Sequence, residues 1–102
     1  MLIVFITTPN LTEAESLAEK VVEAKLAACV QILPEISSVY VWEGKLQKTN
    51  EHLLLIKTLP EKWDELCDFI NANHSYDVPE IVAINAEKVS EPYQSWLDET
   101  LL

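Results

Sequence analysis

Residues 27–58 decide the fold of this chain, and they read AACVQILPEISSVYVWEGKLQKTNEHLLLIKT. Two runs rich in β-branched and aromatic residues flank Gly44, which is the only glycine in the protein. Because glycine adopts positive φ at no steric cost, a lone glycine between two such runs is the typical centre of a hairpin turn. The stretch therefore predicts a long β-hairpin, with Pro34 as a kink or bulge in its first strand.

Apolar patterns on both sides of the hairpin predict the other elements. A short apolar run, Leu2 to Ile6, is typical of a buried strand. Thr12 and Glu15 match a capping box that begins a helix running to about Lys25. Pro60 suits the first turn of a second helix. The remaining predicted elements are a strand in two parts at Cys29–Ile32 and Ser37–Trp42, strands at Leu46–Lys57 and Pro79–Asn85, and a short helix after Ser90.

The order strand, helix, strand, strand, helix, strand defines the split βαβ, or ferredoxin-like, α+β sandwich, followed here by a short C-terminal helix. Right-handed crossovers are expected to place both main helices on one face of a four-stranded antiparallel sheet. With 102 residues the chain has room for one core, so residues 1–102 are expected to form a single domain.

The predicted strands are apolar on both faces, which is unusual for a sheet that has helices on one face only. Leu2 to Ile6 and Leu53 to Ile56 show no polar alternation. An uncovered second face would expose a large apolar patch, which soluble monomers rarely tolerate. The pattern therefore predicts an oligomer, in which another copy covers this face and pairs with free strand edges.

The composition excludes several classes of partner. Seventeen acidic residues stand against seven basic ones, all of them lysines, so the formal net charge is −10. Such a chain should repel nucleic acid and anionic membranes. A glycine-rich phosphate loop cannot be built from one glycine, and no organic cofactor is expected. No pairing of a nucleophile with a base is apparent, so the protein is expected not to be an enzyme.

The cysteines and the N-terminal sequence bear on the compartment. The first apolar run is too short for a secretion signal or a membrane span, and no basic region precedes it. Cys29 and Cys67 are therefore expected to be reduced and mostly buried. These features together predict a cytoplasmic protein.

Four residues have side chains that bind soft or borderline metal ions: Cys29, Cys67, His52 and His74. None of them pairs at the spacing of a zinc finger or of two histidines on one helical turn. His74 is the strongest candidate because it follows the second helix in a polar loop where exposure is expected. The alternatives are a histidine that stabilises the helix C-terminus and a polar residue of the surface without a further role. Cys29 is either a soft ligand facing a cleft between subunits or a small core residue.

Several separated motifs resemble the CutA family of divalent-cation tolerance proteins. They are LAACVQI at 26–32, YVWEGK at 40–45, Glu51, Lys57-Thr58, HSYDVPEI at 74–81 and YQSWL at 93–97. The resemblance covers nearly the whole chain. It implies a homotrimer of ferredoxin-like subunits, similar in architecture to PII signalling proteins. It also implies tolerance of divalent metals, with Cu²⁺ or another divalent cation as the ligand.

The resemblance also identifies where metal would bind. The copper ligands of some CutA members are a cysteine on the first strand and two adjacent histidines after the second helix. This chain has Ile6 at the cysteine position and Asn73 at the first histidine position, so only His74 of that set is present. We therefore expect His74 to be the main metal ligand, with Cys29 as the second candidate.

A second candidate site combines charged and aromatic residues at family-typical positions: Trp42, Glu51, Lys57, Tyr76 and Glu80. Lys57 ends a very apolar strand, so it is expected to pair with Glu51 or Glu80. One interpretation is an ion pair between subunits that fixes the register of the trimer. The other is a small-molecule or anion pocket, and it supports an alternative function: a PII-like signalling or scaffold trimer that binds a small ligand or a partner protein at intersubunit clefts.

Overall fold

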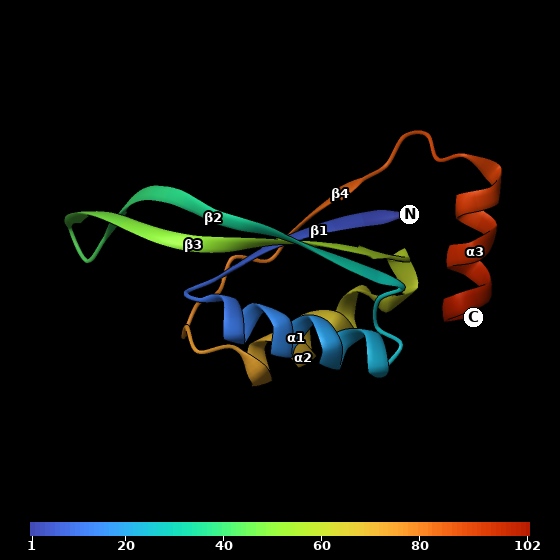
Figure 1. Ribbon diagram of the computed structural model, residues 1–102, viewed down its shortest axis with the longest axis horizontal. Coiled ribbons are helices and arrows are strands. Elements are labelled where there is room, and N and C mark those ends of the chain that lie inside the picture. Colours follow the sequence, from blue (N-terminus) through green and yellow to red (C-terminus); the bar gives the residue numbers. More distant parts are fainter.

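The computed structural model describes residues 1–102 as a four-stranded sheet with two helices on one face and a third helix at one end (Figure 1). The elements are β1 (Leu2–Thr8), α1 (Leu11–Glu23), β2 (Cys29–Trp42), β3 (Lys45–Thr58), a 3₁₀ turn (Pro60–Lys62), α2 (Trp63–Asn73), β4 (Val82–Asn85) and α3 (Glu91–Leu101). All neighbouring strands are antiparallel, in the order β2-β3-β1-β4. This confirms the predicted ferredoxin-like α+β fold. None of the helices combines the length and the apolar character needed to cross a bilayer.

The β2–β3 hairpin is much longer than the other strands and extends beyond the helices (Figure 1). We call residues 36–51, its projecting half, the arm. Glu43 and Gly44 form the turn with φ values of 52° and 76°, so both central residues have positive φ as in a type I′ turn. The strand register shifts beside Pro34. The turn and the bulge predicted from the sequence are both confirmed.

The first helix begins and ends differently from the prediction. Asn10, not Thr12, is the N-cap, and its side-chain oxygen accepts the Glu13 amide hydrogen at 2.8 Å. Asparagine in the extended conformation is among the strongest N-caps, so the helix begins as soon as the break after β1 allows. α1 ends before Lys25, which has a φ of 59°. A left-handed residue of this kind stops the helix.

The fourth strand is shorter than predicted. It covers Val82–Asn85, whereas the pattern predicted a start at Pro79. β4 pairs only with Leu2–Phe5 of β1, so the residues before it have no partner strand. Residues 74–81 instead form the loop that joins α2 to β4, which we call the 74–81 loop.

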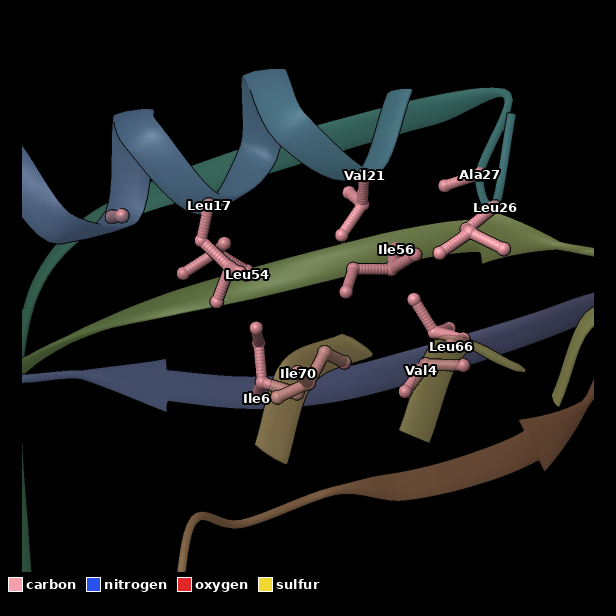
Figure 2. Close-up of a cluster of buried hydrophobic side chains, with 11 residues drawn as sticks. Val4, Ile6, Leu17, Val21, Leu26, Ala27, Leu54, Ile56, Leu66 and Ile70 are labelled. Carbon is pink, nitrogen blue, oxygen red and sulfur yellow. The ribbon is translucent and has the colours of Figure 1, made fainter. Parts of the chain in front are cut away.

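One hydrophobic core lies between the sheet and the helices. Side chains from β1, β3, α1 and α2 point toward one another there (Figure 2). The largest of them are at most 2% exposed: Val4, Ile6, Leu17, Val21, Leu54, Ile56, Leu66 and Ile70. Burial of such a side chain contributes about 1.5–3 kcal/mol, so this cluster is the main source of stability. A smaller cluster around Leu97 and Leu101 packs α3 against Leu59 and Ala28 at the end of the sheet.

The opposite face of the sheet carries no helix (Figure 1). Side chains alternate along a strand, so the residues between the core positions point to this side. We call it the open face, and its apolar residues are Ile3, Phe5, Leu33, Leu53, Leu55, Val82 and Ile84. Val82 and Ile84 are 51% and 50% exposed. The prediction that the strands are apolar on both faces is confirmed.

Candidate functional site

The largest cavity of the molecule lies between the 74–81 loop and the arm. Its volume is about 600 Å³, and its walls are formed by Thr7, Tyr40, Trp42, Glu51 and residues 75–80. Four of the five residues predicted to share a cleft are therefore brought together: Trp42, Glu51, Tyr76 and Glu80. Three aromatic rings and three carboxylates line the cavity, and no lysine does.

Glu51 is the most buried charged residue of this cavity. It is 6% exposed, and the hydroxyl of Tyr76 donates a hydrogen bond to its Oε2 at 3.0 Å. No lysine lies within ion-pair distance of this carboxylate. Burial, followed by the hydrogen bond to Glu51 and the charge of Glu51, raises the pKa of Tyr76 from 10.0 to about 12. Tyr76 therefore remains a neutral donor over the physiological pH range.

Lys57, the fifth predicted cleft residue, lies elsewhere on β3. Its Nζ donates a hydrogen bond to Oε1 of Gln31 at 2.8 Å. Six residues of extended strand separate it from Glu51, which corresponds to about 20 Å. Within one chain, the expected ion pair of Lys57 with Glu51 or Glu80 does not form, so this prediction is wrong. The lysine is hydrogen-bonded to a glutamine of the neighbouring strand instead. An ion pair between subunits stays a prediction.

His74 is not an exposed loop residue, as the sequence predicted, because its side chain is 0% exposed. Its Nε2 lies 2.7 Å from the Thr7 carbonyl oxygen, and its Nδ1 accepts the Tyr76 amide hydrogen at 3.0 Å. A nitrogen that accepts an amide hydrogen carries no proton, so the two bonds assign a neutral ring protonated at Nε2. The imidazole thereby anchors the 74–81 loop to the end of β1.

Glu13 reinforces the same anchor from α1. Its Oε2 accepts the Ser75 amide hydrogen at 3.2 Å and lies 3.5 Å from Nδ1 of His74. The carboxylate lies in the first turn of the helix, where a negative charge is favourable. Both ring nitrogens of His74 and the nearest carboxylate are thus already engaged in holding the loop.

Cys29, the second predicted metal ligand, is not close to His74. Cys29 pairs with Lys57 in the strand register, whereas Thr7, the partner of His74, pairs with Leu53. Four residues of strand, about 13 Å, therefore lie between them. No three histidine, cysteine, aspartate or glutamate side chains of the chain come together as metal ligands. Metal binding by His74 and Cys29 stays a prediction, and it would need ligands from more than one subunit.

The other two possible soft ligands have separate surroundings. His52 pairs with Thr8, and its Nδ1 is buried with no hydrogen-bond partner. Cys67 lies on α2 and is half-buried rather than fully buried. Burial, and then the charges of Asp64 and Asp68, raise the pKa of the Cys67 thiol. A thiol of this kind forms the nucleophilic or metal-binding thiolate less readily.

Thr7, Tyr40 and Asp77 also line the cavity, although they were not among the predicted cleft residues. A signal for Tyr40 was present, since it precedes Trp42 by two residues and side chains two apart on a strand share a face. Asp77 lies within the 74–81 motif. Thr7 gave no signal, because its place in the cavity depends on how the 74–81 loop returns to β1.

Known proteins resemble this chain over nearly its full length. Protein CutA, chloroplastic, of Arabidopsis thaliana is 47% identical over 94% of this chain and 53% of that protein. The chain thus spans about half the length of this plant relative. The divalent-cation tolerance protein CutA of Archaeoglobus fulgidus is 44% identical over 96% of this chain and 95% of the relative. A solved structure of the periplasmic divalent cation tolerance protein CutA from Archaeoglobus fulgidus superposes with a TM-score of 0.96 at 42% identity, covering 100% of both chains.

The predicted cytoplasmic location is wrong. The Arabidopsis thaliana relative is named chloroplastic, and the Archaeoglobus fulgidus structure is described as periplasmic. Proteins with this fold and similar sequence therefore occur in other compartments. The reduced cysteines and the short first apolar run do not distinguish these compartments.

A family model shows how much of the chain matches the family. The model described as CutA1 divalent ion tolerance protein matches residues 2–100. The matched region includes the hairpin, the 74–81 loop and α3 except for its last residue, and it contains all the motifs that first indicated the resemblance. The solved structure of the divalent cation tolerance protein from Thermus thermophilus agrees, with a TM-score of 0.94 at 40% identity over 98% of both chains. The chain belongs to the CutA1 family of divalent ion tolerance proteins.

Proposed function

We propose that this protein supports tolerance of divalent cations as a homotrimer, which binds or responds to metal ions such as copper and is not an enzyme. Membership of the CutA1 divalent ion tolerance family supports the general role. The three-fold assembly follows from the resemblance to CutA proteins. The geometry of the single chain supports the need for an oligomer.

The open face is the observation that carries this proposal. Its apolar side chains lie on all four strands, and the helices of the same chain do not cover them. The two outer strands, β2 and β4, also leave backbone groups free at the sheet edges. Burial of the open face against other copies would remove apolar surface from water and satisfy the edges at the same time.

Sedimentation equilibrium at micromolar concentration and below tests the assembly. We expect a single species of three times the chain mass, with little dissociation on dilution. An assembled species of a different size would contradict the three-fold symmetry alone. A stable monomer would contradict the whole assembly.

Metal capture is the second part of the proposal. One chain does not bring three ligands together, so the metal is held where subunits meet, with His74 as the main ligand. His74 must first release the Tyr76 amide, which frees the lone pair of Nδ1. Ligation therefore competes with the anchoring of the 74–81 loop, and metal binding would alter that loop.

Calorimetric titration with Cu²⁺ tests this site. We expect about one tight site per subunit, lost in His74→Ala and retained in His52→Ala, which serves as the matched histidine control. Cys29→Ser reports whether the thiol contributes as a soft ligand. An isotherm that is unchanged in His74→Ala would exclude direct capture at this loop, and tolerance would then require another mechanism.

The cavity favours a second function. We propose that the trimer, as a PII-like signalling or scaffold protein, binds a small ligand at this site. The supporting observation is that a cavity of about 600 Å³ contains four family-typical cleft residues. Pockets of this size hold small organic molecules. Titration with a metabolite panel beside Cu²⁺ separates this function from metal capture.

A further inference from the structure

The cavity between the arm and the 74–81 loop has a lining that selects one class of ligand. We infer that it binds an organic cation, in which ammonium groups are carried on an apolar body, and neither an anion nor a bare metal ion. This inference rests on the second proposed function and names the ligand class of that site. It replaces the anion that the analogy with PII proteins suggested.

The charges that one chain contributes to the cavity disfavour an anionic ligand. Glu51, Asp77 and Glu80 line it, whereas none of the seven lysines does. The whole chain has a formal net charge of −10, which adds a negative field at the cavity entrance. Such a field concentrates cations and repels phosphates and carboxylates.

Glu51 points most directly to a cationic partner. The residue is 6% exposed, and Tyr76 donates a hydrogen bond to its Oε2. Oε1 is not among the fully buried atoms, so it is open to the cavity, and the protein gives it no hydrogen-bond donor and no counter-charge. A buried carboxylate is costly unless its oxygens and its charge are satisfied. An ammonium group supplies both a hydrogen-bond donor and the missing positive charge.

The position of Tyr76 is fixed independently of a ligand. Its backbone amide bonds to His74, and the two rings lie with their centroids 4.9 Å apart. Because His74 is itself anchored to Thr7, the donor that orients Glu51 is preorganised. A ligand therefore meets a carboxylate already held in place, which lowers the entropic cost of binding.

The aromatic residues distinguish an organic cation from a metal ion. Tyr40 and Trp42 line the cavity and are 40% and 52% exposed in the single chain, so their rings can face a ligand that enters the cavity. Such rings attract ammonium groups through their negative faces and also contact alkyl chains. A divalent metal ion would need several oxygen ligands at one point, and the cavity carboxylates do not converge in that way.

A neighbouring subunit is the competing source of the missing charge. Glu51 and Thr7 lie on the same side of the sheet as the open face, so a second copy seated there would approach the cavity. Lys57 lies on that side too, with only Gln31 as a partner. Its ammonium group could enter the cavity of a neighbouring chain and occupy the place that we assign to a ligand.

Calorimetric titration of the full chain with spermidine, at two salt concentrations, tests the inference. We expect one saturable site per chain that persists at the higher salt. Glu51→Gln should weaken binding about tenfold or more, as expected for loss of a charged hydrogen bond. Trp42→Ala should weaken it about twofold to fivefold, as expected for a partly exposed cation–π contact. Glu61→Gln, which removes an equal charge from an exposed position outside the cavity, should change affinity less than about twofold.

Three results would overturn the inference. Equal weakening by Glu51→Gln and Glu61→Gln would show attraction to the acidic surface alone. Absence of saturable spermidine binding, with ATP binding in its place, would reject the cation while leaving a ligand-binding cleft intact. Dissociation of the oligomer by both Glu51→Gln and Lys57→Gln would assign the counter-charge to a neighbouring subunit.

The oligomeric state distinguishes failure of this inference from failure of the second proposed function, on which it rests. A monomer that still binds spermidine through Glu51 would reject the cleft between subunits and support the organic cation as ligand. A trimer that binds no cation would support the assembly and reject the organic cation. Trp42 lies near the exposed tip of the arm, so Trp42→Ala is expected to fold and to keep the test decisive if Glu51→Gln is unstable.

Discussion

Leu54 and Leu55 are neighbours on β3 and have the same side chain, but they depend on different partners. Leu54 is 0% exposed and packs under the helices (Figure 2), whereas Leu55 lies on the open face and is only partly covered. Local sequence does not distinguish the two positions. The difference teaches that one face of this sheet is completed by the chain's own helices, and that the other requires a partner the single chain does not contain.

Replacement of Leu54 by Asp breaks the covered face and has the largest expected effect. The change removes a core side chain, which costs about 2–5 kcal/mol, and buries a charge without a partner. Such a sum approaches the total stability of a typical domain, so we expect the variant to be unfolded. Circular dichroism and urea denaturation measure this. A native-like spectrum with an unchanged denaturation midpoint would show that the helices do not seal this face.

Replacement of Leu55 by Asp is the matched test of the open face. The charge would face solvent in a monomer, so the fold should persist, but it would be buried in the proposed trimer. We expect a folded monomer in sedimentation equilibrium, with the helical circular dichroism retained. Leu55→Met, which preserves volume and apolar character, should remain assembled. Unfolding of Leu55→Asp to the same extent as Leu54→Asp would remove the distinction between the two faces.

The sequence predicted features whose causes are local. Gly44 marked the turn because a two-residue hairpin needs positive φ there, and Pro34 marked the bulge because it cannot donate to a strand ladder. The N-cap of α1 was harder to predict, because Asn10 and Thr12 are both residue types that favour this position. The contact at the end of β1 selects Asn10, since the Thr8 hydroxyl donates a hydrogen bond to the Asn10 carbonyl oxygen. The strand pattern does not give that boundary.

The sequence could not predict contacts between distant segments. The bond from His74 to Thr7 joins residues 67 apart, so the burial of this histidine depends on the complete fold. The contact of Lys57 with Gln31 is a diagonal pair on adjacent strands and could be predicted once the register is known. The composition of the cavity was largely predicted, and its lack of a positive charge was not, because Lys57 proved to be remote.

The pair of Tyr76 and Glu51, beside the open face, gives a smaller, pH-dependent effect. Folding raises the pKa of Tyr76 from 10.0 to about 12, so the folded state retains this proton longer than the unfolded state. The corresponding stability is fully present below pH 10.0 and is lost as the pH rises through about 12. We expect Tyr76→Phe to lose less stability than the wild type over this alkaline range in urea denaturation. Tyr93, whose pKa burial also raises, is present in both proteins and cancels in the comparison. Equal slopes against pH would show that folding does not raise the pKa of Tyr76.

The two cysteines give the mildest probe of the two faces, because thiol labelling reports the accessibility of side chains that the protein already has. Cys29 lies on the open face beside Lys57 and Tyr93 of α3, whereas Cys67 lies on α2, on the other side of the sheet. If other copies cover the open face, Cys29 should react slowly with a thiol reagent in the wild type and several-fold faster in Leu55→Asp. Cys67 should react at one slow rate in both proteins, because burial and the nearby aspartates raise the pKa of its thiol in the single chain. Cys29→Ser and Cys67→Ser assign the two rates. Equal labelling of Cys29 in both proteins would mean that no other copy covers the strand at this point, because Tyr93 of the same chain lies beside this thiol in both. The contact between copies would then have to lie farther along the arm.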